Sequence, residues 1–265
     1  MFIVDELVKE YPNAMSFSGN HLFHYTTLDS AVKIILTNTL NFGRFHNMND
    51  IAEVRRELYD KYGSNRFEQA ISKYQSISLT LDTSHMERGF AIDSLWGYYA
   101  DKGNGVCLVF DRSKILNEYY KLCRKKRFSI PHNMKVEYVE YFTNTNFVDL
   151  RTKRELEDYV KENIQDLFYK KAQFWQHEKE FRFVIKSEAK VSLGLSDSLI
   201  GAIICVPRED NYKNSEQYRL LSKLQTIRKF PIYYYGINFG TRILKEDGVQ
   251  LWPILEKDYN IDVNG

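Results

Sequence analysis

Two glutamates, Glu178 and Glu180, stand two positions apart in the sequence, on either side of Lys179. In an extended strand, residues two apart point to the same side. We therefore expect both carboxylates to face one cavity, with Lys179 turned away from it. Paired carboxylates suit glycosidic chemistry, in which one acid stabilises a cationic sugar and the other orients or deprotonates the attacking group.

Two further segments offer polar groups for the same chemistry. His24, Tyr25 and Thr26 end a short strand-like run, and Ser78 and Thr80 alternate with apolar residues in QSISLTL. An alternating pattern places the hydroxyl groups on one face of a strand. Two other interpretations stay open: the glutamates pair with Arg182, Lys179 or another basic residue on a solvated edge, and His24 is a core histidine bonded to a carbonyl.

Other catalytic classes lack their motifs. The six histidines form no helical His-Glu-x-x-His pair, so we expect no metal site. The chain has no Gly-x-Ser-x-Gly elbow, no Walker loop and no dinucleotide-binding glycine fingerprint. Cys107 and Cys205 lie in apolar runs, where a thiol acts as a small hydrophobic group rather than as a nucleophile.

The composition is that of a folded protein. The chain has 265 residues, of which 43% are hydrophobic and 15% aromatic, enough to form a core without staples. The net charge of +2 is small for a protein held to nucleic acid by counterion release. Three scattered cysteines indicate reduced thiols, and we find neither a signal peptide nor a long apolar run. We therefore expect a cytoplasmic protein with no membrane contact.

Strands and helices alternate irregularly along the chain. The patterns predict strands at 21–26, 75–81, 105–111, 134–142, 180–186, 200–207 and 230–238, and helices at 28–38, 51–73 and 150–172, with a strand and polar loop over 39–50. A short helix within 92–105 is expected to end at the Gly-rich loop, where Gly103 and Gly105 suit a positive φ. Without a regular βαβ order, the pattern favours an α+β fold with a mixed or antiparallel sheet. We see no domain boundary and expect a single domain, 1–265.

Five segments together resemble a bacterial protein family, the domain-of-unknown-function family 2971. They are HYTTL (24–28), FHNMND (45–50), SISLT (76–80), LWGYYADKGNGVCLVFD (95–111) and FWQHEKEFRFVIK (174–186). The resemblance covers most of residues 22–206 and leaves 207–265 as a C-terminal extension. The sequence departs from the family pattern at Leu79-Thr80, where an aromatic residue and a serine are more usual.

This family is similar to the ADP-ribosyltransferase-like fold, which implies a largely antiparallel split sheet with flanking helices. Three signature strands are implied: His24 matches the first, Ser78 and Thr80 approximate the second, and Glu178 with Glu180 match the third. The resemblance implies that NAD is the substrate and that no metal takes part.

The resemblance also implies residue roles. Glu180 would bind the ribose 2′-hydroxyl and stabilise the sugar cation left after nicotinamide departs, while Glu178 would orient the acceptor. His24 would bind a ribose, and Tyr25 or a nearby aromatic residue would support nicotinamide. Trp96 and Tyr99 would form a cleft wall or, equally, belong to the core. Asn47 and Asp50 would cover the cleft or form an Asx turn.

The resulting expectation is a bacterial NAD-dependent ADP-ribosyltransferase-like enzyme or NAD glycohydrolase, with a role in defence or toxin systems. Its acceptor is water, a small molecule, a protein or a nucleic acid. The alternative is a non-catalytic module that binds a nucleotide or nucleic acid. For nucleic acid, the candidate contacts are the basic run Arg124-Lys125-Lys126-Arg127 beside Phe128, with Lys170-Lys171 near the glutamates.

Overall fold

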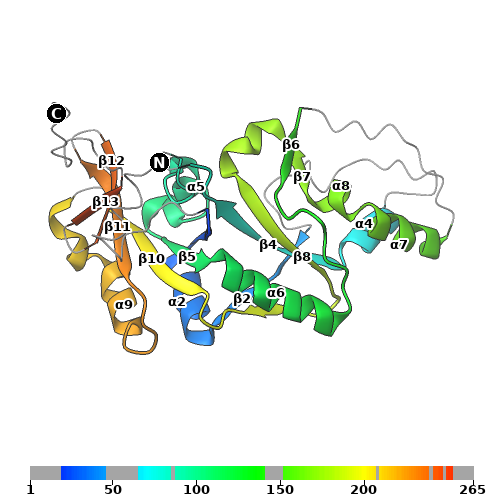
Figure 1. Ribbon diagram of the computed structural model, residues 1–265, viewed down its shortest axis with the longest axis horizontal. Coiled ribbons are helices and arrows are strands. Elements are labelled where there is room, and N and C mark those ends of the chain that lie inside the picture. The colour runs from blue at the N-terminus through cyan, green and yellow to red at the C-terminus, as the bar shows by residue number, and fades with distance from the viewer. Residues whose placement is uncertain are drawn as a thin grey trace, which may run out of the picture. The chain divides into compact units, whose positions relative to one another are not determined.

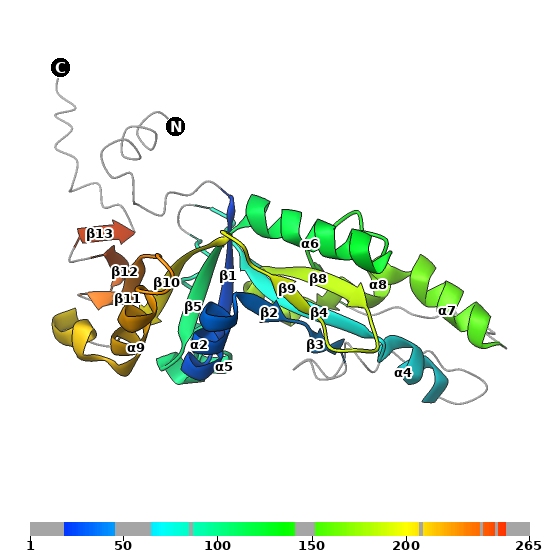
Figure 2. The same cartoon turned by 90° about the horizontal axis from the view of Figure 1, so that it is seen from below.

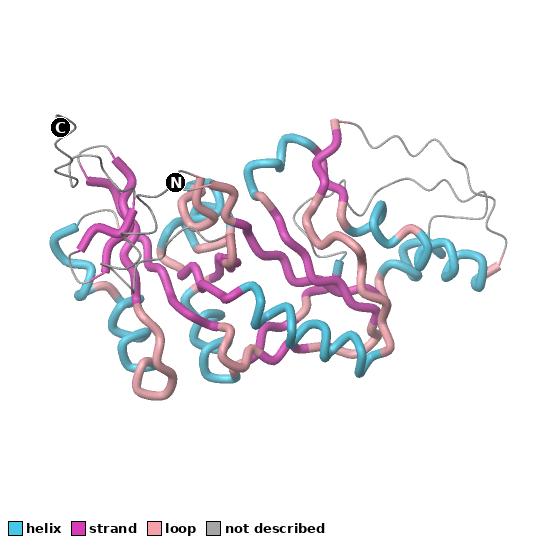
Figure 3. The backbone as a smooth tube through the Cα atoms, in the orientation of Figure 1, coloured by secondary structure: helices cyan, strands magenta, loops and turns pink. Residues whose placement is uncertain are grey.

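The computed structural model describes residues 19–45, 65–84, 87–140, 152–206, 209–238, 241–246 and 249–252 (Figure 1). The chain divides into two compact units. Unit 1 comprises Met1–Thr37, Leu81–Arg112 and Asp197–Gly265, and unit 2 comprises Asn38–Thr80 and Ser113–Ser196. The single-domain organisation stays a prediction. Figure 3 shows the strands of both units in magenta and the helices in cyan.

Unit 1 is built on a largely antiparallel sheet. Its strands are β1 (His21–Thr26), β5 (Val106–Asp111), β10 (Leu199–Cys205), β11 (Ile232–Asn238), β12 (Thr241–Glu246) and β13 (Val249–Trp252). They lie in the order β13-β12-β11-β10-β5-β1, and only the pair β10–β11 is parallel. The apolar run of β5 occupies an inner position with five of its six residues buried, as expected for a strand covered on both faces. The expected C-terminal extension therefore adds strands to this sheet.

The helices of unit 1 are α2 (Leu28–Thr37), α5 (Asp93–Tyr98), η2 (Asp101–Gly103), η4 (Glu209–Asn214) and α9 (Glu216–Leu224). Thr27 starts α2 by accepting a hydrogen bond from the Ser30 backbone N–H through its side-chain oxygen, as expected of an N-cap threonine. A core of aromatic and aliphatic side chains forms on one side of β1, β5 and β10; Phe23, Tyr25, Trp96 and Tyr235 belong to it.

Unit 2 contains three groups of paired strands. The strand β4 (Tyr74–Leu81) pairs along its length with β8 (Glu180–Lys186) and near its start with β3 (Gly43–Arg44). The strand β2 (Thr39–Asn41) pairs with β9 (Ser192–Gly194), also antiparallel, and β6 (Glu137–Val139) pairs in parallel with β7 (Lys170–Ala172). The helices are α4 (Asn65–Ile71), α6 (Arg112–Lys126, whose first residue belongs to unit 1), α7 (Lys153–Glu162), α8 (Ile164–Phe168) and η3 (Gln173–Glu178).

The helix α6 packs alongside β8. Figures 1 and 2 show the two elements side by side, and the Tyr119 hydroxyl donates a hydrogen bond of 2.6 Å to the Val184 carbonyl oxygen. The Tyr119 ring stacks on Phe183, with ring centroids 4.5 Å apart. The first six residues of β8 are buried, so the strand is covered on both faces although its sequence alternates.

The predicted α+β class with a largely antiparallel sheet is confirmed. The strands predicted at 21–26 and 180–186 have those bounds, and most other predicted strands agree to within two residues. No helix among the described residues is long and apolar enough to cross a membrane. Of the helix predicted at 51–73, only α4 falls within the described residues.

Two predicted elements are wrong in extent. The helix predicted over 150–172 ends at Glu162, where Asn163 bonds its side-chain amide to the Tyr159 carbonyl oxygen, and residues 170–172 form β7 instead. A capping box between Thr152 and Glu155 starts this helix. The strand predicted over 134–142 is reduced to β6 and an isolated bridge from Lys135 to Phe181, and its last two residues lie outside the described residues.

Two glycines near η2 serve different purposes. Gly103 has the expected positive φ of 92°. Gly105 does not have a positive φ. It must be glycine because other backbone atoms lie close to it: a Cβ atom there would lie 2.2 Å from the Thr26 carbonyl oxygen and 2.8 Å from the Ala100 Cα atom. Both obstacles are backbone atoms, so no side chain can move aside to make room.

We predict that Gly105→Ala lowers the free energy of unfolding by about 2 kcal/mol or more, because the new methyl group forces backbone atoms apart. Gly97→Ala is the matched control: it adds the same methyl group in α5, where nothing lies within 4 Å, and should raise stability by up to about 1 kcal/mol. Urea-induced unfolding followed by circular dichroism measures both. Equal stability of the two variants would contradict the close-approach argument.

Candidate functional site

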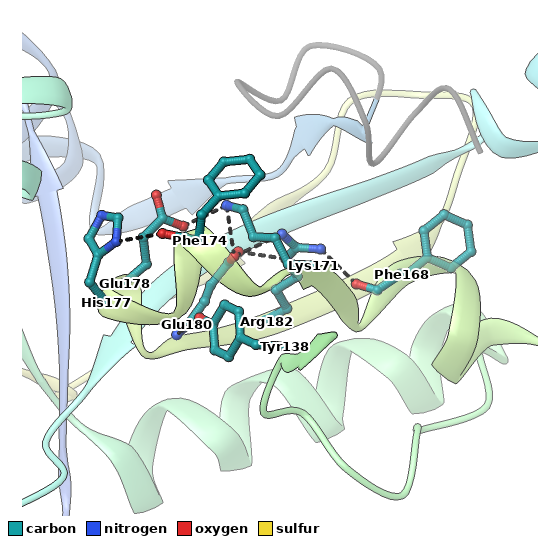
Figure 4. Close-up of polar contacts among 8 residues, drawn as sticks. All are labelled: Tyr138, Phe168, Lys171, Phe174, His177, Glu178, Glu180 and Arg182. Carbon is teal, nitrogen blue, oxygen red and sulfur yellow. Dashed lines mark hydrogen bonds and ion pairs between the residues drawn. The ribbon is translucent and has the colours of Figure 1, made fainter. Parts of the chain in front are cut away.

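Four charged side chains form a buried cluster in unit 2 (Figure 4). Lys171 comes from β7, Glu178 from the end of η3, and Glu180 and Arg182 from β8. Their exposed fractions are 3%, 4%, 5% and 0%, respectively. We call these four residues the charge cluster. It holds two cations and two anions, which is the balance that a low-dielectric interior requires.

Glu180 is held by both cations of the charge cluster. Arg182 donates from Nε to Oε1 at 2.5 Å and from Nη2 to Oε2 at 2.8 Å, and Lys171 Nζ lies 3.4 Å from Oε2. Burial acts to raise the pKa of Glu180, but the charges of Arg182 and Lys171, with the hydrogen bonds from Arg182, outweigh it and lower the pKa to about 2. Glu180 is therefore a carboxylate anion throughout the physiological range.

Glu178 lies beside Glu180 as expected, but the backbone conformation that brings it there is not that of a strand. It ends η3 rather than opening the strand, and Lys179 follows in the left-handed region with a φ of 48°. The alternation of a strand therefore does not apply to this pair. The two carboxylates still converge, because Lys171 Nζ donates to Glu178 Oε2 at 2.5 Å and also contacts Glu180.

Arg182 ties the charge cluster to the rest of unit 2. Its Nη1 donates to the Phe168 carbonyl oxygen at 2.8 Å, at the end of α8, and its guanidinium lies 5.4 Å from the centre of the Phe45 ring. Among the alternatives, ion pairing of Glu180 with Arg182 is thus observed. The pair is buried rather than on a solvated edge.

Lys171 is the member of the charge cluster whose role sequence reasoning missed. It was considered with Lys170 as a nucleic-acid contact, yet its side chain is buried against Glu178 and Glu180, and Lys170 forms an ion pair with Asp166 at 2.6 Å. The only signal in the sequence is a lysine seven positions before Glu178 and nine before Glu180. Residue 171 was predicted to lie in a helix over 150–172, whereas it lies in β7. The direction of the Lys171 side chain follows from this strand, so the helix prediction could not place it beside the glutamates.

Ser78 and Thr80 lie directly beside the acids. In the antiparallel ladder between β4 and β8, Ser78 is opposite Arg182 and Thr80 is opposite Glu180. Opposite residues point to the same face of a sheet, so the hydroxyl groups share the face of the charge cluster. The structure thus brings together the expected second and third signature strands.

The remaining candidate residues belong to unit 1. The Tyr25 hydroxyl donates to the Gly89 carbonyl oxygen at 2.8 Å, and Trp96 Nε1 donates to the Phe90 carbonyl oxygen at 2.9 Å. The two rings meet edge to face in the core, with centroids 5.2 Å apart. Of the two alternatives for Trp96, the structure therefore favours the core, whereas the nicotinamide contact of Tyr25 stays a prediction.

Three other candidates in unit 1 have simpler surroundings. In the ladder with β5, His24 is half-buried opposite Leu108, and Thr26 is buried opposite Val106. Tyr99 packs partly buried against the same core as Trp96. Asn47 and Asp50 lie outside the described residues. The NAD contacts expected of His24, Thr26 and Tyr99 stay predictions.

Unit 1 has a buried ion pair of its own. Asp82 accepts hydrogen bonds at Oδ1 from Arg88 Nε at 3.0 Å and from the Gly89 backbone N–H at 2.8 Å, and His21 Nδ1 lies 3.6 Å from Oδ2. Burial acts to raise the pKa of Asp82, but His21 and Arg88 outweigh it and lower the pKa. The hydrogen bond from the Gly89 backbone N–H to Asp82 holds the loop in which the Gly89 carbonyl oxygen accepts a hydrogen bond from the Tyr25 hydroxyl. Within the described ranges, no group of three or more metal-ligating side chains occurs.

One comparison with known proteins gave a match. Residues 95–183 match a family described as "Protein of unknown function (DUF2971)", whereas no curated protein and no solved structure matches. The matched segment runs from α5 into β8 and contains the whole charge cluster. The resemblance to family 2971 is therefore confirmed over residues 95–183.

Proposed function

We propose that the protein cleaves the nicotinamide–ribose bond of NAD, as an ADP-ribosyltransferase-like enzyme or an NAD glycohydrolase. The observation that carries the proposal is a buried glutamate, Glu180, kept as an anion beside a second carboxylate and opposite a strand of hydroxyl groups. Departure of nicotinamide leaves a positively charged, oxocarbenium-like ribose. A fixed anion in a low-dielectric site stabilises such a cation without reorganising at the moment of reaction.

The two glutamates take different roles in this proposal. Glu180 supplies the fixed negative charge, and Arg182 holds it in place through two hydrogen bonds. Glu178 orients the acceptor that attacks the sugar. Water as acceptor gives hydrolysis, whereas a protein, a nucleic acid or a small molecule gives transfer, and both reactions share the first step. The NAD contacts of His24, Tyr25, Thr26 and Tyr99, which the family resemblance implies, are part of this proposal.

We place this activity in the bacterial cytoplasm, in a defence or toxin system. Cys107, Cys123 and Cys205 are free thiols, which fits a reducing compartment. The bacterial source and the defence role follow from the family resemblance.

Two observations favour a second candidate function, a non-catalytic module that binds a nucleotide or a nucleic acid. Both oxygens of Glu180 already accept hydrogen bonds from the chain's own cations, which is typical of a structural ion pair. In addition, four consecutive basic residues, 124–127, are exposed at the end of α6. Release of nicotinamide from NAD by the purified protein distinguishes the two functions, because only the enzyme produces it.

We predict that Glu178→Gln lowers the rate of nicotinamide release at least about a hundredfold. The glutamine keeps a hydrogen-bond acceptor for Lys171 but loses the charge that orients the acceptor. Glu162→Gln is the control, since this glutamate is exposed at the end of α7 and its variant should match the wild type. Chromatographic quantification of nicotinamide measures both. A wild-type rate in Glu178→Gln would remove this residue from the mechanism.

The low pKa of Glu180 predicts how stability depends on pH. The pKa is about 2 in the folded chain against the ordinary 4.5, so the stabilisation is complete above pH about 4.5 and is lost as the pH falls towards 2. We expect the free energy of unfolding to fall by a few kcal/mol over this range. Glu180→Gln should flatten this part of the profile, as measured by urea unfolding at each pH; a profile as steep as that of the wild type would contradict the assignment.

A double variant separates catalysis by Glu180 from its structural role. Glu180→Gln alone leaves the Arg182 charge buried without its anion and should cost about 3–5 kcal/mol of stability. Adding Arg182→Met removes that charge and should recover part of the loss. If Glu180 is catalytic, the double variant folds but releases no nicotinamide. A folded double variant with the wild-type rate would show that the pair serves only the fold.

A further inference from the structure

Two ring nitrogens on η3 are buried without a hydrogen-bond partner. They are Nε1 of Trp175 and Nε2 of His177, and neither has a partner among the residues that the structure describes. A buried polar atom left in this way destabilises the folded state, and such atoms are uncommon enough to need an explanation. Both lie in the segment that matches the family.

Both rings adjoin the charge cluster. Lys171 Nζ lies 4.8 Å from the centre of a Trp175 ring. His177 immediately precedes Glu178 in η3, and Figure 4 shows the two side chains near each other. The rings of Trp175 and His177 are stacked, with centroids 6.1 Å apart and planes inclined by 30°. The two nitrogens therefore belong to one small region at the edge of the proposed site.

The hydrogen-bonding character of the two nitrogens differs. His177 Nδ1 lies 3.1 Å from the Phe174 carbonyl oxygen. A carbonyl oxygen only accepts, so this contact selects the imidazole tautomer with the proton on Nδ1, in which Nε2 is an acceptor. The indole Nε1–H of Trp175 only donates. The pair thus offers one donor and one acceptor.

One donor beside one acceptor restricts which ligand groups can hydrogen-bond to both nitrogens. A phosphate or carboxylate accepts hydrogen bonds but does not donate to His177 Nε2, and the neighbouring charge cluster has no surplus positive charge to attract an anion. A hydroxyl group both donates and accepts, and two adjacent hydroxyl groups can serve both nitrogens at once. The exposed ring of Phe174, 69% exposed and 5.2 Å from the Trp175 ring, offers an aromatic face beside them.

We infer that Trp175 and His177 bind the cis-diol of a ribosyl ligand at the edge of the charge cluster. The inference deepens the proposed function and rests on it for the choice of ribose among diols. Because both nitrogens are shielded from solvent, binding must shift η3. Gln173, Phe174 and Gln176 of this helix are exposed, so the shift disturbs few packed side chains.

The test compares ligands with and without the diol. Isothermal titration of the wild-type protein uses ADP-ribose as the first probe, and then AMP against 2′,3′-dideoxy-AMP. We expect ADP-ribose to bind and the loss of the diol to weaken AMP binding about tenfold or more, the effect of one or two hydrogen bonds. This comparison needs no variant, so it does not depend on how any substitution folds.

Variants then locate the contact. Trp175→Phe removes the indole Nε1–H, and His177→Phe removes both ring nitrogens, including the Nδ1 that contacts the Phe174 carbonyl oxygen. Each variant should weaken ADP-ribose binding about tenfold. His132→Phe, at an exposed histidine, is the matched control and should bind as the wild type does. Circular dichroism and thermal unfolding confirm that each variant is folded. The stability of His177→Phe should stay close to that of the wild type, because loss of the Nδ1 hydrogen bond to the Phe174 carbonyl oxygen opposes the gain from removing the unpartnered Nε2.

The outcomes separate this inference from the proposed function. ADP-ribose lacks nicotinamide, so its binding does not require cleavage. Diol-dependent binding without nicotinamide release would refute the proposed function and leave the diol contact intact. Any of three results would overturn the inference: equal affinity for AMP and its dideoxy analogue, no binding of ADP-ribose, or unchanged affinity in folded Trp175→Phe and His177→Phe. Water alone would then be the hydrogen-bond partner of the two nitrogens.

Discussion

The pairing of Arg182 with Glu180 is the contact on which the organisation of unit 2 depends. A fully buried guanidinium is costly unless its charge and its N–H groups are satisfied. Glu180 supplies the charge, and the Phe168 carbonyl oxygen takes a further N–H group. Lys171 and Glu178 add one charge of each sign and bring β7 and η3 to the same point. The charge cluster thus fixes short elements that have little regular pairing of their own.

The same contacts set what the site can do chemically. Strong pairing keeps Glu180 ionised and immobile, which is what electrostatic stabilisation of a sugar cation requires. It also engages both carboxylate oxygens, so Glu180 acts through its field more readily than through a new hydrogen bond. Glu178 accepts a hydrogen bond from Lys171 and, in the proposed mechanism, takes the separate role of orienting the acceptor.

The sequence predicted those parts of the fold that follow from local pattern. The strands at 21–26 and 180–186 were predicted with their bounds because their alternation and β-branched or aromatic content are strong local signals. Lys171 was missed because its direction depends on β7, a three-residue strand created by pairing with distant residues. The convergence of Glu178 and Glu180 was predicted, but a left-handed Lys179 and a shared lysine produce it rather than strand alternation. His24 belongs to unit 1 and Glu180 to unit 2, so no local pattern relates them.

Charge balance also explains why the region beside the acids suits a neutral polar ligand. A site that recognised phosphate first would need cations in excess, whereas both cations here are committed to carboxylates. The polar groups left over, on Trp175 and His177, are one uncharged donor and one uncharged acceptor. Leaving them unpaired lowers the stability of the protein alone, and a ligand hydroxyl restores what is lost. Under the proposed function, these two groups lie where a ribose would bind, beside the carboxylates proposed to act on its glycosidic bond.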